Sequence, residues 1–231
     1  MNGGVERSGS AAAGKLVACP RRVLILPSMA LPVKTRPMTP EEYLRIEREA
    51  LDKSEYYGGE MFAMAGGGRR HSLIKLNVGG TLRSLLKGRR CTAYDSDLRI
   101  GIPADGLYTY PDLSIFCEPM TFIPGTDDTA TNPAVIVEVL SKTTEAYDRG
   151  RKFESYRRLP SLREYLLVSQ DAPLIERFTR EGDDRWVLTT ARGLDAVLPL
   201  PLIEAELPLA EVYDKVDFTT PETPPAAGAQ A

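Results

Sequence analysis

The chain has 231 residues, of which 42% are hydrophobic and 26% are charged. This is enough apolar material to close the core of one large domain or two small ones without disulfides. The formal net charge of -3 argues against a protein that coats nucleic acid with its whole surface and against an acidic disordered chain. No stretch approaches the roughly 18 uninterrupted apolar residues of a membrane helix, so we expect no membrane partner.

The three cysteines are an odd number, lie far apart in the sequence and include no CxxC pair; they are Cys19, Cys91 and Cys117. These features argue against a disulfide framework and against a thiolate zinc site. They are typical of a protein from a reducing compartment, so the sequence predicts a cytoplasmic location.

The two ends of the chain differ in composition from its middle. Residues 1–37 open with the small, polar stretch MNGGVERSGSAAAGK, and we expect this extension to be disordered. A later apolar run in it is cut by prolines and lies too far along for a signal peptide, and Met29 is an alternative start. Residues 218–231 form a Pro/Ala-rich tail for which we also expect disorder. One folded domain is therefore expected over residues 38–217.

A helix is predicted at the start of the folded part. Thr39 provides a hydroxyl N-cap, Pro40 suits the first helical position, and glutamates follow in the first turn. The next segment, SEYYGGEMFAMA, predicts a turn at Gly58-Gly59 that leads into a strand. After a triple glycine, the segment HSLIKLNVGGTLRSLLKG carries apolar residues at helical spacing.

The pattern changes to β after Gly88. The segment CTAYDSDLRIGI alternates, and a turn-rich stretch joins it to PDLSIFC. The β-branched run AVIVEVLS is typical of a central strand covered on both faces. A helix is then predicted over TTEAYDRGRKFESYRRL, followed by the buried strand EYLLVS and a short β tail. This order predicts an α/β fold, with a mixed sheet flanked by helices on both sides and extra β-strands.

Two carboxylates stand out by their position. Asp112 follows a proline at the start of one predicted strand, and Glu138 lies inside the most apolar strand. Burying an acid among valines is costly unless the acid is paired, hydrogen-bonded or bound to a metal. If the two strands are neighbours, both side chains converge at one end of the sheet, where two hard oxygen ligands suit Mg²⁺.

The segments YPDLSIF and NPAVIVEVLSKTTEAYDRGRKFESYRRLPSLREYLLV, together with MTPEEYL, SEYYGGEMFAMAGG, SDLRI and LAEVYDKVDF, resemble one known family. It is the Uma-type family of predicted restriction endonucleases, a branch, common in cyanobacteria, of the PD-(D/E)xK superfamily. The likeness covers nearly the whole folded part. It implies a restriction-endonuclease-like core of helix, three strands, helix and strand, which agrees with the pattern above.

The resemblance implies that Asp112 and Glu138 are the two superfamily acids. The lysine that usually follows the second acid by two residues is absent, because that position is Leu140. In the Uma-type branch a lysine on the following helix stands in for it, and Lys152 matches that position. The resemblance thus implies a Mg²⁺ or Mn²⁺ ion held by Asp112, Glu138, the Val139 carbonyl and, directly or through water, the family acid Glu55.

The implied activity is cleavage of DNA by a metal-activated water, with Lys152 orienting the water or neutralising phosphate. His71 matches a family position, and no acid occurs from Gly66 to Tyr94, whereas basic residues are frequent there. We expect this region to bind the DNA backbone through His71, Arg69, Arg70 and Lys75. A homodimer is one option for a nuclease that cuts both strands, but no interface can be read from the sequence.

Simpler interpretations exist for each residue. Asp112 suits a turn after proline, Glu138 suits a structural ion pair, and Lys152 suits an i,i+4 pair with Asp148. Glu55 suits a solvated hairpin, and His71 suits a helix start. Two other functions therefore stay open: a DNA-binding or scaffold protein whose nuclease site has decayed, and a metal-assisted hydrolase of a smaller phosphate ester.

Overall fold

The computed structural model describes residue 1 and residues 36–64, 66–182 and 184–220. The predictions for most of the N-terminal extension, with Cys19 and Met29, and for the tail from residue 221 fall outside these residues. The folded unit begins at Pro37, one residue before the expected start. At the other end Phe218 packs on Tyr213, with ring centroids 5.6 Å apart, so the packed chain continues past Asp217.

A six-stranded mixed sheet forms the centre of the fold. The helical segment of residues 145–156, called the second helical segment below, lies between two strands that form the only parallel pair of this sheet in the described chain. The other neighbouring strands are antiparallel. In spatial order the strands are β11 (Trp186–Arg192), β10 (Leu174–Arg180), β9 (Glu164–Val168), β8 (Val135–Val139), β6 (Leu113–Phe116) and β3 (Thr92–Asp95).

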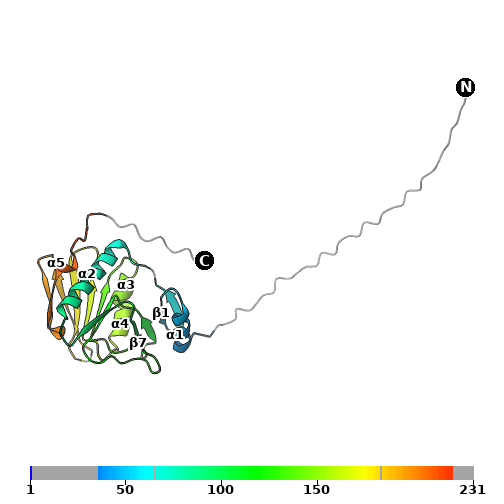
Figure 1. Cartoon of the computed structure of the whole chain (residues 1–231), viewed down its shortest axis with the longest axis horizontal. Helices are drawn as coiled ribbons and strands as arrows, with labels where there is room; N and C mark the ends of the chain where they lie inside the picture. Colours follow the sequence, from blue (N-terminus) through cyan, green and yellow to red (C-terminus); the bar gives the residue numbers. More distant parts are fainter. Residues whose placement is uncertain (2–35, 65, 183, 221–231) are drawn as a thin grey trace. The chain divides into compact units, whose positions relative to one another are not determined.

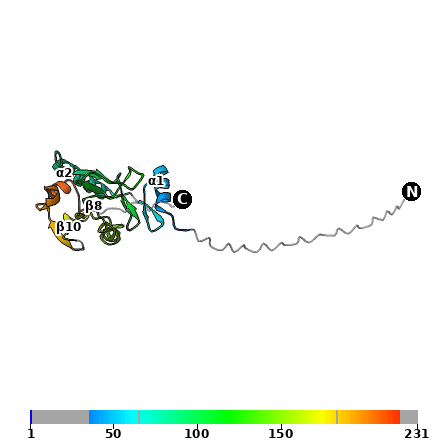
Figure 2. The same ribbon diagram turned by 90° about the horizontal axis from the view of Figure 1, so that it is seen from below.

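Helical segments cover both faces of this sheet (Figures 1 and 2). The helix α2 (Arg69–Leu85) packs on the face that carries Val135 and Val137 of β8. On the other face, Ile136 packs with Tyr156 of a second helical segment. Alternation along β8 therefore points Glu138 toward that second segment. The predicted order of helix, three strands, helix and strand is confirmed.

The structure differs from the prediction in having separate sheets. A five-stranded sheet contains, in order, β2 (Glu60–Ala63), β1 (Ser54–Tyr57), β5 (Leu107–Thr109), β4 (Arg99–Ile102) and β7 (Thr129–Ala130), and a hairpin is formed by β12 (Val197–Leu200) and β13 (Ala205–Pro208). The segment expected as one alternating stretch breaks after β3, where the Asp97 N–H donates to the Asp95 carboxylate at 3.0 Å. This turn sends β3 and β4 into different sheets.

The predicted first helix is α1 (Pro40–Glu49), and it begins with a capping box. The Thr39 N–H donates to the Glu42 carboxylate at 2.8 Å, and the Glu42 N–H donates to the Thr39 hydroxyl at 3.3 Å. The remaining helical pieces are a 3₁₀ turn (Pro201–Ile203) and α5 (Leu209–Val212). Among the described residues, no helix is long and apolar enough to cross a bilayer.

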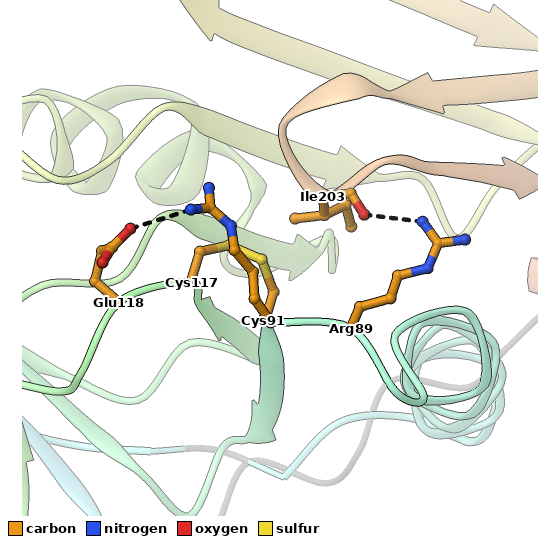
Figure 3. The surroundings of a disulfide bond; sticks show 6 residues. Arg89, Cys91, Cys117, Glu118 and Ile203 are labelled. Carbon is orange, nitrogen blue, oxygen red and sulfur yellow. Dashed lines mark hydrogen bonds and ion pairs between the residues drawn. A yellow bond between two sulfur atoms is a disulfide. The ribbon is translucent and has the colours of Figure 1, made fainter.

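A disulfide joins Cys91 and Cys117 (Figure 3), so the inference that the cysteines stay unpaired is wrong. The two cysteines are 26 residues apart in the sequence but adjacent in space. The register Thr92↔Phe116 places them opposite each other at the ends of β3 and β6. Sequence spacing alone carries no information about this pairing. Next to the bridge, Arg90 forms an ion pair with Glu118 at 3.3 Å.

Reduction of this disulfide is expected to destabilise the protein. Closing a loop of this length restricts the unfolded chain and contributes about 3 kcal/mol to the free energy of unfolding. Urea unfolding with and without a phosphine reductant measures the effect. A Cys91→Ser/Cys117→Ser variant should match the reduced wild type and be insensitive to reductant; equal midpoints for oxidised and reduced wild type would contradict the prediction.

Glu164 is a buried acid at the start of β9, remote from the acids discussed above along the strand direction. It is 1% exposed, and its nearest ion-pair partner is Arg177 at 3.8 Å. Its Oε2 atom has no hydrogen-bond partner. Burial raises the pKa of Glu164 to about 7, although Arg177 acts in the opposite direction.

The raised pKa of Glu164 predicts a stability contribution that is present below pH 4.5 and lost as the pH rises through 7, because the folded state binds the proton more tightly. Between pH 5 and pH 7 the wild type should lose about 2 kcal/mol more than Glu164→Gln. Urea unfolding across this pH range tests it, with the exposed Glu181→Gln as control. Parallel curves for wild type and Glu164→Gln would show the prediction to be wrong.

Candidate active site

Most of the site residues predicted from the sequence line one cavity of about 570 Å³. It is bordered by the end of β2, the start of α2, the start of β6, the end of β8 and the helical segment after β8. The selected residues that line it are Glu55, Arg70, His71, Asp112, Glu138, Val139 and Lys152.

Asp112 and Glu138 lie side by side because their strands pair in register. The pair Leu113↔Val137 places the two acids opposite each other on neighbouring antiparallel strands. The Asp112 N–H donates to Glu138 Oε2 at 3.2 Å, and the Val139 N–H donates to Asp112 Oδ2 at 2.8 Å. Two carboxylates from adjacent strands are thus held together at one end of the sheet.

The first turns of α2 supply cations to Asp112. His71 Nε2 lies 3.3 Å from Oδ2, and Lys75 Nζ lies 3.2 Å from Oδ1. Burial would raise the pKa of Asp112, but His71, Lys75 and the Val139 N–H together lower it. Burial would likewise lower the pKa of His71, but Asp112 and a hydrogen bond to the Val139 backbone raise it. These opposite shifts favour a charged His71–Asp112 pair.

Gly67 makes room for the imidazole of His71. A Cβ atom at position 67 would lie 2.5 Å from His71 Nδ1, which is far inside van der Waals contact. The glycine-rich stretch before α2 therefore has a steric role at the rim of the cavity.

Lys152 is buried among three carboxylates and does not point to solvent; it is 6% exposed. Its Nζ lies 3.1 Å from Glu138 Oε1, 3.1 Å from Glu55 Oε1 and 3.4 Å from Asp148 Oδ1. Burial would lower the pKa of Lys152, but the three carboxylates raise it well above its usual range. The predicted i,i+4 pair with Asp148 exists, and the contact with Glu138 exists beside it.

The helix that carries Lys152 is less regular than the sequence predicted. It consists of α3 (Glu145–Tyr147), a π-helical turn (Asp148–Lys152) and α4 (Phe153–Tyr156). π-Helical turns inside helices occur frequently at functional sites. Here the turn contains both Asp148 and Lys152, which are buried.

Sequence reasoning missed Tyr156 as a member of the site and treated Asp148 only as a partner of Lys152. The Tyr156 hydroxyl donates to Glu138 Oε1 at 2.9 Å, and this side chain is fully buried. The signal was the four-residue spacing of Asp148, Lys152 and Tyr156, which places them on one side of a helix.

Asp112 and Glu138 are the two adjacent carboxylates that this cavity offers to a divalent cation. Burial raises the pKa of Glu138 to about 8; Lys152 lowers it, and Asp148 and Asp112 raise it further. Burial is the largest cause of this raised pKa, so Glu138 binds a proton more tightly than an exposed glutamate does. In the part of the chain that the structure describes, no three acidic, histidine or cysteine side chains are arranged to hold one ion. Two carboxylates with water and phosphate oxygens satisfy Mg²⁺.

Arg70 has a second role that the sequence did not reveal. Its guanidinium donates to the carbonyls of Gln170 at 3.2 Å and Thr220 at 2.8 Å, and it lies 5.7 Å from the centroid of the Phe218 ring. Arg70 thus ties the segment from Phe218 to Thr220 to the edge of the cavity, which that segment lines. Arg69 is exposed and lies outside the cavity lining.

Comparison with known proteins shows the family of this chain. Residues 40–210 match the family model Uma2, described as "Putative restriction endonuclease". Two uncharacterised proteins of Synechocystis sp. are similar: one is 38% identical over 68% of this chain and 82% of its own length, and the other is 34% identical over 73% and 95%.

A solved structure shows the same fold. It is described as that of a putative nuclease belonging to DUF820 from Anabaena variabilis, and it superposes with a TM-score of 0.63 at 18% identity, over 77% of this chain and 98% of that chain. With the family match over most of the folded part, this establishes that the chain belongs to the Uma2 family of restriction-endonuclease-like proteins.

Proposed function

We propose that the protein is a divalent-metal-dependent endonuclease that hydrolyses the phosphodiester bonds of DNA with water. One observation carries the proposal: Asp112 and Glu138 lie side by side in a cavity, and the Lys152 ammonium contacts Glu138 at 3.1 Å. Two acids and a lysine are the groups that the superfamily signature combines. The family match supports a nuclease, and the DNA substrate, the metal and the mechanism belong to the proposal.

Mg²⁺ or Mn²⁺ would be held by Asp112, Glu138 and the Val139 carbonyl, and would supply a water of lowered pKa and positive charge at the scissile phosphate. Glu55 lies on the Lys152 side of the site, 3.1 Å from the ammonium, so it acts on the metal region through Lys152 or through water. His71 and Lys75 hold Asp112 in place from α2.

Lys152 acts as a fixed cation in this proposal. Because the surrounding carboxylates raise its pKa well above the usual range, it stays protonated at neutral pH and does not accept a proton from water. Its role is to hold Glu138 and Glu55 and to compensate charge that develops on the phosphate.

The position of Leu140 supports an active site rather than a decayed one. Leu140 is 3% exposed and packs in the apolar cluster between the sheet and the second helical segment. Lys152, from the helical segment that covers the same face of the sheet, supplies an ammonium group to the neighbouring Glu138. The missing lysine of the sequence motif is therefore replaced in space.

DNA is the proposed substrate because basic side chains gather at the start of α2 beside the acids. Arg70, His71 and Lys75 lie at or next to the cavity, and Arg69 is exposed at the first position of the helix. Arg70, His71 and Lys75 are engaged by backbone carbonyls or by Asp112, so the exposed Arg69 is the member of this group best placed to capture a phosphate backbone before hydrolysis.

Plasmid nicking tests the proposal. With Mg²⁺ or Mn²⁺ the wild type should convert supercoiled DNA to open circles, and chelation should abolish the reaction. Asp112→Asn and Glu138→Gln should each lower the rate by at least about 100-fold, whereas the exposed Glu181→Gln should leave it unchanged. Nicking that survives both site substitutions would contradict the proposal, and DNA binding without nicking would favour the decayed-site alternative.

Lys152→Met separates the structural and functional roles of the ammonium. It leaves three buried carboxylates uncompensated and should lower the free energy of unfolding by about 3–5 kcal/mol, with loss of nicking. Adding Glu138→Gln should restore part of the stability and none of the activity. Urea unfolding at pH 7 gives the first quantity and the nicking assay the second; a Lys152→Met protein of wild-type stability would argue against the buried charge cluster.

A further inference from the structure

Phe62 is a large aromatic side chain that the fold leaves half exposed beside the candidate active site. It is 48% exposed and lines the cavity together with Met64, which is 37% exposed. A single exposed apolar residue needs no explanation. Phe62 and Met64, however, lie on one short stretch of chain at the rim of a charged cavity. They form a local apolar surface that is not packed into the described core.

Strand register places Phe62 on the site side of its hairpin. Phe62 is paired with Glu55 across β1 and β2, and directly opposed residues of antiparallel strands share a face. Met61, one residue earlier, points to the other face and packs with Tyr43 and Tyr56. Met64 lies two residues after Phe62 and so points to the same side of the extended chain. Both side chains therefore lie on the face that carries Glu55.

A short chain of contacts links Phe62 to the acids within the same cavity. Opposed Cβ atoms lie about 5 Å apart, and the Glu55 carboxylate is joined to Glu138 through Lys152 by two contacts of 3.1 Å each. A stacked strand rises about 3.4 Å per nucleotide. The steps from Phe62 through Glu55 and Lys152 to Glu138 add to more than about 10 Å, so a strand with its phosphate at Asp112 and Glu138 reaches the Phe62 ring with a base a few nucleotides away.

We propose that Phe62, with Met64 beside it, is a stacking platform for an unpaired base a few nucleotides from the scissile phosphate. This inference rests on the proposed nuclease function and names its substrate class: DNA that is single-stranded at the cut, including gaps and flaps. An aromatic ring can stack on a base only where that base is free of its duplex neighbours. The apolar rim and the basic start of α2 then bind the base and the backbone of the same strand.

Binding measured without cleavage tests this inference. Fluorescence anisotropy in EDTA compares a short labelled oligo-dA strand with the same strand in a duplex. Phe62→Ala should weaken single-strand binding about 5- to 100-fold and leave duplex binding unchanged. Phe62→Leu keeps the apolar bulk but lacks a π face, so it should behave like Phe62→Ala, whereas Phe62→Trp should retain the affinity. Leu188→Ala, at an exposed leucine on β11 outside the cavity lining, is the matched control.

The outcomes distinguish this inference from the nuclease proposal. Wild type that binds neither oligonucleotide overturns the stacking inference, whereas the nuclease proposal stands or falls by the nicking assay. Wild type that prefers the single strand, with the preference intact in Phe62→Leu, overturns only the stacking role. Size-exclusion chromatography tests whether a second copy of the chain, rather than DNA, binds the Phe62 surface. If Phe62→Leu converts a dimer to a monomer and leaves DNA affinity unchanged, the second copy is the occupant and the inference fails. Circular dichroism melting checks that each variant is folded. If Phe62→Ala is not folded, the result for Phe62→Leu decides the test.

Discussion

The ammonium group of Lys152 connects the parts of this protein on which the site depends. Its three carboxylate partners come from different places: Glu55 from β1 of the five-stranded sheet, Glu138 from β8 of the six-stranded sheet, and Asp148 from its own π-helical turn. A buried charge is tolerated only with such compensation. The ion cluster thus fixes the two sheets relative to each other at the cavity, and the requirement for charge balance links the fold to the site.

A second set of contacts holds Asp112 from the opposite side. The helix α2 packs its apolar residues on the central sheet, and this packing brings His71 and Lys75 to the aspartate. Asp112 and Glu138 consequently have separate groups of partners, joined by two backbone N–H donors. The pKa of Asp112 is lowered by its cationic partners, whereas burial raises that of Glu138 to about 8. The two acids nevertheless stay close together, as the proposed two-carboxylate metal site requires.

The five-stranded sheet adds specificity to this common core. Its edge strand β2 contributes Met61 to the packed cluster with Tyr43 and Tyr56, and it directs Phe62 to the cavity. The start of α2 lines the same cavity, and Arg70 holds the segment from Phe218 to Thr220 at its edge. In the proposed function the central sheet carries the chemistry, and these peripheral segments determine which nucleic acid reaches it.

The sequence by itself determined the features that depend on neighbouring residues. Thr39 and Glu42 are close enough in the chain to form their capping box without other partners, and the apolar spacing of α2 and the β-branched run of β8 reflect the periodicity of each element. An acid inside that run, at Glu138, was informative because its burial has a high cost. Asp112 was singled out by its position after a proline at the start of a predicted strand, and motif likeness then added Lys152.

Only the tertiary structure decided the features that depend on register and on packing between distant segments. The Cys91–Cys117 disulfide, the division into separate sheets and the contact of Tyr156 with Glu138 each join residues far apart in the chain. The secondary-structure propensity of each segment does not predict such pairs, because it does not set the strand register. A shift of one residue in register moves every side chain of a strand to the opposite face. For the same reason the position of Phe62 opposite Glu55 became visible only when β1 and β2 were paired.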